Sequence, residues 1–426
     1  MKKTLKKLSA LVLALAMIVA MSATAFAANS DGDVNIDKGI DSTDVTINIA
    51  KQIVFVNAED TTVREPNITY TYTISAVTPT EATITDKDDI TGTVKAGILS
   101  AVKGAATDTT STVAFTDSAT SAATANGTST ASKYAAFTFT ASAFNAPGIY
   151  RYKISETASP AKASVGITEA AEYNAARYLD VYVKWNDDAH TTLAVYGYVL
   201  FEGTDSQTIK SAQLTPPGDV SMKSAGYVNT SATAGTQEDV DVYTTQNLYI
   251  NKTTTGSLAD KNNDFPIAVT LTAPSGVSNV KLDVTTTGSG SLTTATDTIG
   301  AHVAAWGNVA GTVRDGSQIA IKGVPAGASV SIVETNNTAD SYKVKAGTAA
   351  DGADILTEAI VAAGANAAAT SAQTLNAKVE IYFTNTLEAI SPTGVVLRFG
   401  PYALMLGAGL ALLILAMRRK SRKNED

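Results

Sequence analysis

The chain has 426 residues, a formal net charge of −8, no cysteine and only two histidines. This length suits two or three domains. Without cysteine the chain cannot carry a disulfide framework, and two histidines make a His-based catalytic centre or a His-rich metal site a poor expectation. The acidic balance argues against nucleic acid or anionic lipid as a partner.

Residues 1–27 are predicted to be a secretory signal peptide. Four early lysines precede an apolar run from Leu8 to Met21, and Ala25-Phe26-Ala27 fits the small-residue cleavage rule. Residues 28–43 are polar and are expected to form a flexible N-terminus. The protein is therefore expected to be secreted and, lacking disulfides, to be stabilised by its core or by some other cross-link.

From residue 44 onward the hydrophobic pattern is that of β-strands. Apolar and polar residues alternate in short segments rich in threonine, valine and tyrosine, which predicts an all-β sandwich fold. We expect a first domain over 44–229, a linker over 230–246 that is rich in Ser, Thr, Ala and acidic residues, and a second domain over 247–388. The clearest segments are 45–51, 69–74, 136–140, 150–156, 178–185, 193–200, 265–271, 329–334 and 379–385.

Each predicted domain begins with a lysine on an apolar strand face. Two isoleucines precede Lys51 at two-residue spacing, and Leu248 and Ile250 precede Lys252 in the same way. Because side chains at this spacing share one face of a strand, both lysines are predicted to point into a core. A single inward charge is usually a residue at the end of a sheet that reaches water.

Each predicted domain also has a glutamate on the apolar face of a strand. Glu156 and Glu334 each continue an alternating apolar segment, and each lies nine residues after a turn proline, Pro147 or Pro325. Lysine and glutamate are thus both predicted to face inward, twice. One interpretation is a buried ion pair, which often gives no net stability.

The alternative interpretation involves Asn385, which continues the inward series of Val379, Ile381 and Phe383. A lysine in an apolar core loses its proton easily and becomes a nucleophile. A buried, protonated glutamate could hydrogen-bond the asparagine carbonyl and relay protons while ammonia leaves. The product would be an internal Lys–Asn amide bond.

Eight segments of the chain, given at the end of this paragraph, resemble the backbone pilins of Gram-positive bacteria, in particular the streptococcal FctA/T-antigen type. The resemblance implies two tandem immunoglobulin-like (CnaB-like) sandwiches, each locked by one Lys–Asn isopeptide bond beside a glutamate, with no metal or cofactor. It assigns Lys252, Glu334 and Asn385 to the second domain, and Lys51 and Glu156 to the first. The matching segments are 47–51, 147–156, 181–186, 248–252, 264–265, 269–271, 381–385 and 392–394.

The acceptor of the first domain has two candidates. Asn229 matches the aromatic-x-Asn closing strand of the resembling family, whereas the family's spacing counted back from Lys252 gives Asp241. Strand alternation favours Asn229, because Tyr227 precedes it by two residues while the acidic Asp239 precedes Asp241. Asp241 remains the alternative.

Residues 389–426 are predicted to be a sorting signal. Pro392, Thr393 and Gly394 precede an apolar run from Tyr402 to Met417, predicted as a transmembrane segment, and a basic tail. In the resembling family a sortase cuts after the threonine and joins it to an amine. That amine belongs either to peptidoglycan or to a lysine of another subunit.

These features predict a structural subunit of a covalent pilus on a Gram-positive cell surface. The polymer bond is expected between Thr393 and Lys223 of the next identical subunit, with Lys210 as the alternative donor. The expected partners are a sortase, identical subunits and peptidoglycan, and further minor pilins and host ligands. The alternative function is a monomeric, wall-anchored surface protein or adhesin. An enzyme is not expected, because no triad, metal cluster or phosphate loop is present in the sequence.

Overall fold

A computed structural model shows an all-β protein, which confirms the predicted fold class. It describes residues 43–59, 62–77, 83–85, 91–103, 109–122, 127–169, 176–201, 209–210, 226–227, 241–278, 280–304, 306–349, 354–389, 402 and 404–417. The predicted signal peptide and residues 28–42 lie outside this part of the chain.

The first half contains the strands β1 (Asp44–Asn57), β2 (Thr62–Arg64), β3 (Ile68–Ala76), β4 (Thr83–Thr85), β5 (Thr91–Ala96), β6 (Thr110–Phe115), β7 (Thr120–Ala122), β8 (Thr128–Thr140), β9 (Gly148–Ser159), β10 (Ile167–Glu169), β11 (Ala176–Trp185), β12 (Leu193–Phe201), β13 (Ile209–Lys210) and β14 (Gly226–Tyr227). It also has three short 3-10 turns, η1 (Leu99–Ala101), η2 (Ala141–Ala143) and η3 (Lys162–Val165).

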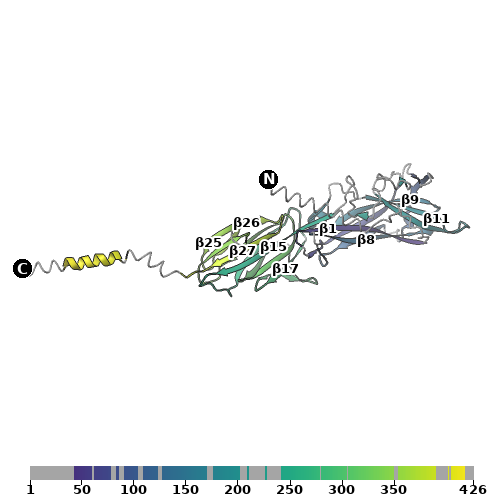
Figure 1. Ribbon diagram of the computed structural model, residues 1–426. Coiled ribbons are helices and arrows are strands. Elements are labelled where there is room, and N and C mark those ends of the chain that lie inside the picture. The colour runs from purple at the N-terminus through teal and green to yellow at the C-terminus, as the bar shows by residue number, and fades with distance from the viewer. Residues whose placement is uncertain are drawn as a thin grey trace, which may run out of the picture.

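The second half contains the strands β15 (Asp241–Thr255), β16 (Phe265–Thr272), β17 (Lys281–Thr287), β18 (Ser291–Leu292), β19 (Ala295–Thr296), β20 (Ala301–Ala304), β21 (Gly307–Val313), β22 (Gln318–Pro325), β23 (Ser329–Thr335), β24 (Tyr342–Gly347), β25 (Ile355–Val361), β26 (Asn366–Thr374) and β27 (Val379–Thr386). Figure 1 shows the two halves arranged end to end.

Each half packs two sheets around its own core. In the first half, β8, β1, β14, β10 and the start of β15 face a sheet that contains β12, β11, β9, β3 and β6. In the second half, β17, β22, β15, β27 and β24 face β21, β16, β23 and β26. The two hydrophobic clusters are separate, and burial of apolar side chains between facing sheets stabilises each half.

Strand alternation decides which side chains enter these cores. In the first part of β1, Val45, Ile47 and Ile49 are buried while Thr46 and Asn48 are exposed. The same alternation runs along β23 and through most of β27. The predicted inward faces are therefore those that the fold buries.

One long strand belongs to both halves. Residues 241–245 of β15 pair in parallel with β1, and residues 248–255 pair in parallel with β27. A single sheet thus runs from one half into the other. Of the linker predicted over 230–246, the structure describes 241–246, and these residues lie in β15 rather than in a separate connecting segment.

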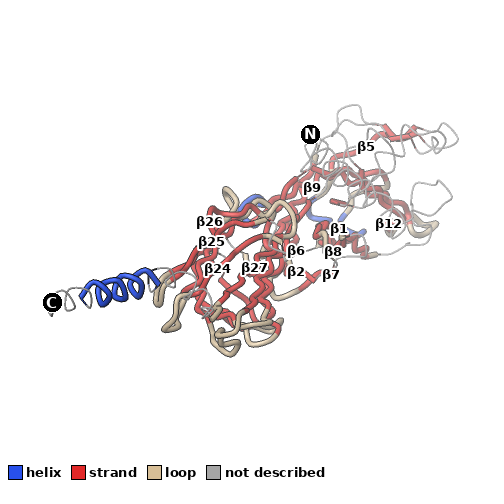
Figure 2. The backbone as a smooth tube through the Cα atoms, turned by 60° about the vertical axis from the view of Figure 1, so that its left-hand side comes forward, coloured by secondary structure: helices blue, strands red, loops and turns tan. Residues whose placement is uncertain are grey.

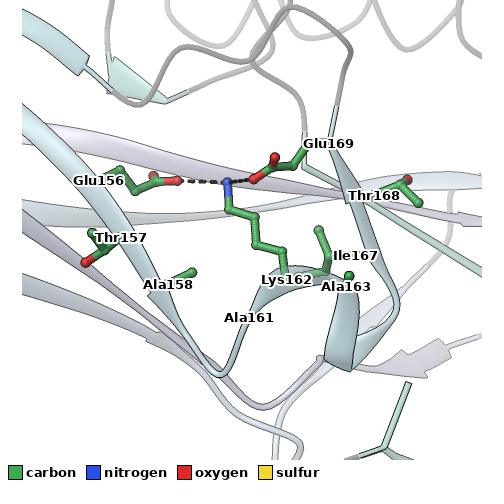
Figure 3. A pocket seen from close by; sticks show the side chains of 9 residues that line it. All are labelled: Glu156, Thr157, Ala158, Ala161, Lys162, Ala163, Ile167, Thr168 and Glu169. Carbon is green, nitrogen blue, oxygen red and sulfur yellow. Dashed lines mark ion pairs between the residues drawn. The ribbon is translucent and has the colours of Figure 1, made fainter. Parts of the chain in front are cut away.

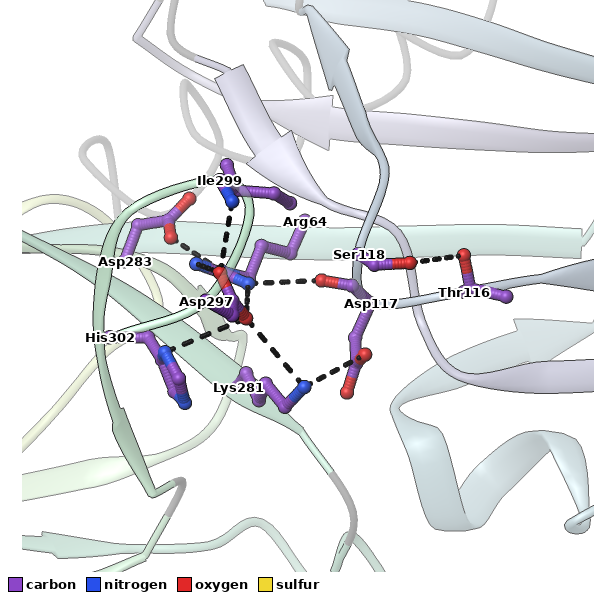
Figure 4. A network of polar contacts seen from close by, with 9 residues as sticks. All are labelled: Arg64, Thr116, Asp117, Ser118, Lys281, Asp283, Asp297, Ile299 and His302. Atoms are coloured by element: carbon purple, nitrogen blue, oxygen red, sulfur yellow. Dashed lines mark hydrogen bonds and ion pairs between the residues drawn. The ribbon is translucent and has the colours of Figure 1, made fainter. Parts of the chain in front are cut away.

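A polar network also joins the halves (Figure 4). Arg64 at the end of β2 forms ion pairs with Asp283 and Asp297 of the second half, and Lys281 Nζ lies 3.0 Å from a carboxylate oxygen of Asp117. The hydrogen bonds from Arg64 hold the pKa of Asp297 well below its usual range. These ion pairs link side chains of the first half to side chains of the second half.

At the C-terminal end, residues 404–417 form a helix beyond the strands (Figure 2). Within the described residues, none of the helices has both the length and the apolar character needed to cross a membrane. The prediction of a transmembrane segment over Tyr402–Met417 fits poorly with this finding.

Candidate functional site: two buried lysine clusters

Three strands of the second half bring Lys252, Glu334 and Asn385 together. Parallel pairing of β15 with β27 places Thr254 opposite Asn385. Lys252 lies two residues before Thr254 and so shares its face of the sheet. Glu334 comes from β23 in the opposite sheet. The side chains of Lys252 and Glu334 are fully buried, and Asn385 has no exposed surface.

Glu334 bridges the other two side chains. Lys252 Nζ lies 2.7 Å from Glu334 Oε2, and Asn385 Nδ2 donates a hydrogen bond of 2.7 Å to Glu334 Oε1. From the sequence we expected Glu334 to donate a hydrogen bond to the asparagine carbonyl. In the structure Glu334 Oε1 instead accepts a hydrogen bond from the amide nitrogen of Asn385.

Burial shifts Lys252 toward its neutral form. Desolvation lowers the pKa of Lys252 to about 8, and the charge of Glu334 offsets part of this effect. The aromatic ring of Phe265 lies below the amine, with Nζ 4.2 Å from the ring centroid. An amine in this environment gives up its proton far more readily than a surface lysine, which is what a nucleophile requires.

The first half has a related cluster around Lys51. Lys51 Nζ lies 3.3 Å from Glu156 Oε1 and 2.7 Å from Asp241 Oδ2, and the side chains of all three residues are fully buried. The predicted partnership of Lys51 with Glu156 is therefore present. The third member of this cluster is Asp241, a carboxylate rather than an amide.

The strand register explains why Asp241 is found there. Ile53, two residues after Lys51, is paired with Asp241, just as Thr254, two residues after Lys252, is paired with Asn385. Alternation did not favour an inward Asp241, yet β15 begins at this residue, and its Asp241, Tyr243 and Thr245 side chains are buried. Asn229 lies outside the described residues.

Two tyrosines that the sequence argument did not single out complete the first cluster. Tyr72 donates its hydroxyl to Glu156 Oε2 at 2.6 Å, and Tyr70 donates to Asp241 Oδ2 at 2.6 Å. Both lie on the inward face of β3, which the alternation in this segment does predict. Their hydroxyls stabilise two neighbouring carboxylates that would otherwise repel each other.

A second lysine also reaches this cluster, and no pattern in the sequence indicated it. Lys162 Nζ, on η3, lies 3.1 Å from Glu156 Oε1, 3.1 Å from Asp241 Oδ1 and 2.7 Å from Glu169 Oε1. Figure 3 shows its amine between the two glutamates. Lys162 also lines a pocket of about 580 Å³, so the cluster lies directly beside a cavity.

Other predicted positions are not placed. Lys223, Pro392, Thr393 and Gly394 lie outside the described residues, and of Lys210 only the backbone position in β13 is described. Over the described ranges, His, Asp and Glu form no group of three or more that could hold a metal ion.

A family model described as a domain of unknown function, DUF7601, matches residues 246–386. This span contains the complete Lys252 cluster and is about a third of the chain. No curated protein matches the sequence.

Solved structures of pilus proteins show a distant likeness. A major pilin from Streptococcus pyogenes is 15% identical at a TM-score of 0.36, with 80% of this chain and 99% of that chain covered. The T-13 major pilin of the same species is 18% identical at 0.32, covering 81% and 99%. A pilus-presented adhesin is 13% identical at 0.23, covering 50% and 36%. At TM-scores this low, nothing about this chain follows from the likeness.

Proposed function

We propose that this protein is a structural subunit of a sortase-assembled pilus on a Gram-positive cell surface, and that each half is locked by a self-formed amide bond. The observation that carries the proposal is the repeated cluster: a buried lysine beside a buried glutamate, with an amide or carboxyl group at the same register on the neighbouring strand. A chain without cysteine gains from these bonds the stability that exported proteins often take from disulfides.

The bond in the second half would form between Lys252 and Asn385. Glu334 takes a proton from Lys252, and the neutral amine attacks Cγ of Asn385. Because Glu334 also accepts a hydrogen bond from Asn385 Nδ2, it can pass this proton to that nitrogen, and it then takes up the second proton that the Lys252 nitrogen loses after the attack. The Cγ–Nδ2 bond then breaks, ammonia leaves, and the Lys252 nitrogen remains bonded to Cγ. Proximity and the absence of water favour the reaction.

The bond in the first half would join Lys51 to Asp241 and release water instead of ammonia. The mass of the recombinant chain tests both bonds together. Expressed without residues 1–27, it should be lighter than its sequence by one ammonia and one water. A mass that equals the sequence mass would refute self-formed cross-links. Two lost ammonia molecules would restore Asn229 as the acceptor.

The polymer bond is proposed between Thr393 and Lys223 of the next subunit. Lys51 and Lys252 cannot serve as donors, because their exposed fractions are 0% and 2%. A head-to-tail bond of this kind does not close on itself and therefore builds a fibre. The proposed partners are a sortase, identical subunits and peptidoglycan.

A ladder of covalent oligomers released from the cell wall tests the assembly. Lys223→Arg keeps the charge but removes the primary amine, so it should abolish the ladder, and Lys210→Arg is the matched control. Loss of the ladder only in Lys210→Arg would move the donor to Lys210. Single subunits without any ladder in the wild type would indicate a monomeric wall-anchored protein.

A further inference from the structure

The two clusters differ by one charge in their acceptor. The second cluster has one lysine, one glutamate and a neutral amide, whereas the first replaces the amide with the carboxylate of Asp241. Two carboxylates close to one lysine leave an excess negative charge in a buried site, which is costly. Negative charge on Asp241 also opposes attack at its Cγ.

Lys162 supplies one additional positive charge at this place. Its side chain is 10% exposed, and its amine contacts Glu156 and Asp241 at 3.1 Å each. Burial by itself lowers the pKa of Lys162, but the charges of Glu156 and Asp241 raise it above its ordinary value. Lys162 therefore stays protonated and is a cation rather than a nucleophile.

The two lysines contact different oxygens of Asp241. Lys51 lies against Oδ2, which also accepts the hydroxyl of Tyr70, while Lys162 lies against Oδ1. The two oxygens of the carboxylate therefore have different surroundings before any reaction takes place. One faces the attacking amine and a hydroxyl, and the other faces a fixed cation.

We propose that Lys162 is a catalytic residue for amide formation in the first half, required there because the acceptor is a carboxylate. This inference rests on the proposed function. Lys162 neutralises the second carboxylate and stabilises the negative charge that develops on Asp241 Oδ1 when Lys51 attacks. Fixed cations aimed at a developing oxyanion are among the strongest catalytic groups in proteins.

The step balances without a further reactant. A bond forms between the Lys51 nitrogen and Cγ of Asp241, and the bond from Cγ to Oδ2 breaks. The ammonium of Lys51 gives up two protons, which leave with Oδ2 as one water, and Glu156 relays them. Oδ1 remains as the amide oxygen. The pocket that Glu156 and Lys162 line gives the released water a place to enter.

The rate of water loss in newly made chains tests this role. After a pulse of synthesis, chains without residues 1–27 are sampled over time, and intact mass and peptide mapping follow each cross-link. Lys162→Met should slow formation of the Lys51–Asp241 bond by about 100-fold, and Lys162→Arg should restore much of the rate. Lys103→Met, which removes an exposed ion pair in the same half, should change nothing.

A double variant separates catalysis from folding. In Lys162→Met combined with Asp241→Asn, the acceptor is neutral and resembles Asn385, so the first-half bond should form again, now with loss of ammonia. If this variant also fails to link while the second half links normally, Lys162 is needed only for the fold of the first half and the proposal is wrong.

Two further outcomes would overturn the role of Lys162: water loss at the wild-type rate in Lys162→Met, or a peptide in which Lys162 itself is bonded to Asp241. The proposed function fails differently, because then the wild type shows neither the loss of water nor the loss of ammonia.

Discussion

Glu334→Gln is the sharpest test of the cross-link in the second half. Glutamine keeps the size of the side chain and can still accept the hydrogen bond from Asn385, but it cannot carry a proton from Lys252 to the leaving nitrogen. The bond should therefore not form, and the chain should be heavier by one ammonia than a fully linked chain of the same variant sequence. The exposed pair of Glu358 with Lys343 in the same half offers a matched control, Glu358→Gln.

The loss of stability can be worked out from the positions of the two strands. A bond between Lys252 and Asn385 closes a loop of about 130 residues, and the chain-entropy model assigns such a closure about 5 kcal/mol. For a domain of this size, 5 kcal/mol corresponds to roughly 10–20 °C in the midpoint of thermal unfolding. Calorimetry on Glu334→Gln, Glu358→Gln and the wild type measures it.

Two results would contradict this reasoning. Peptide mapping that finds Lys252 still bonded to Asn385 in Glu334→Gln would remove Glu334 from its role as the proton relay. An unlinked Glu334→Gln chain that unfolds at the wild-type temperature would show that the bond does not stabilise the fold.

Two other predictions follow from the structure. In Asn385→Ala, Lys252 cannot be bonded, and its folded-state pKa of about 8 lies below its ordinary value of 10.5. Between these two pH values the unfolded chain therefore binds more protons than the folded chain. The free energy of unfolding of this variant, relative to the wild type, should rise as pH increases from about 8 to 10.5. Denaturant titrations measure it, and a difference between the two proteins that does not change with pH would argue against the prediction. Arg64→Met should lower stability more than Lys103→Met, because Arg64 pairs with two carboxylates between the halves while Lys103 forms an exposed pair; equal unfolding curves would show that the network contributes nothing.

The inward faces of the strands could be predicted from the sequence. Lys51, Glu156, Lys252, Glu334 and Asn385 all continue alternating segments, and all five are buried. The reason is that the side-chain period of a strand is two residues, so neighbours in one strand fix the direction of the next side chain. The roles of these residues in a covalent bond remain proposals.

The inward position of Asp241 could not be predicted by the same rule. β14 and β15 are separate strands in the sequence, yet both pair in parallel with β1, at Lys51 and at Ile53 respectively. Around Asp241 the neighbouring side chains at two-residue spacing do not form an apolar series, so alternation gave no sign of an inward face there, and the register with β1 shows it. Spacing from Lys252 had given Asp241 as the alternative candidate.

Lys162 and the pair of Arg151 with Asp180 could not be predicted either. Lys162 lies on a 3-10 turn, where no strand alternation applies, and it meets the cluster only because η3 folds against β15 through β10. Arg151 and Asp180 lie on adjacent strands and form a fully buried ion pair. Each residue alone looks like a surface charge, and their partnership depends on the register between β9 and β11.

The long strand β15 has a mechanical consequence. Tension applied at the C-terminal end of β27 would cross into β15 through the proposed bond at Lys252, so residues 253–384 would carry none of it and could not lengthen. From Lys252 the force would continue along β15 into the first half, because β15 is one continuous strand over Asp241–Thr255. A fibre of such subunits would transmit a pull as a cable does, through a short backbone path in each second half, while the sandwich around that path stays folded.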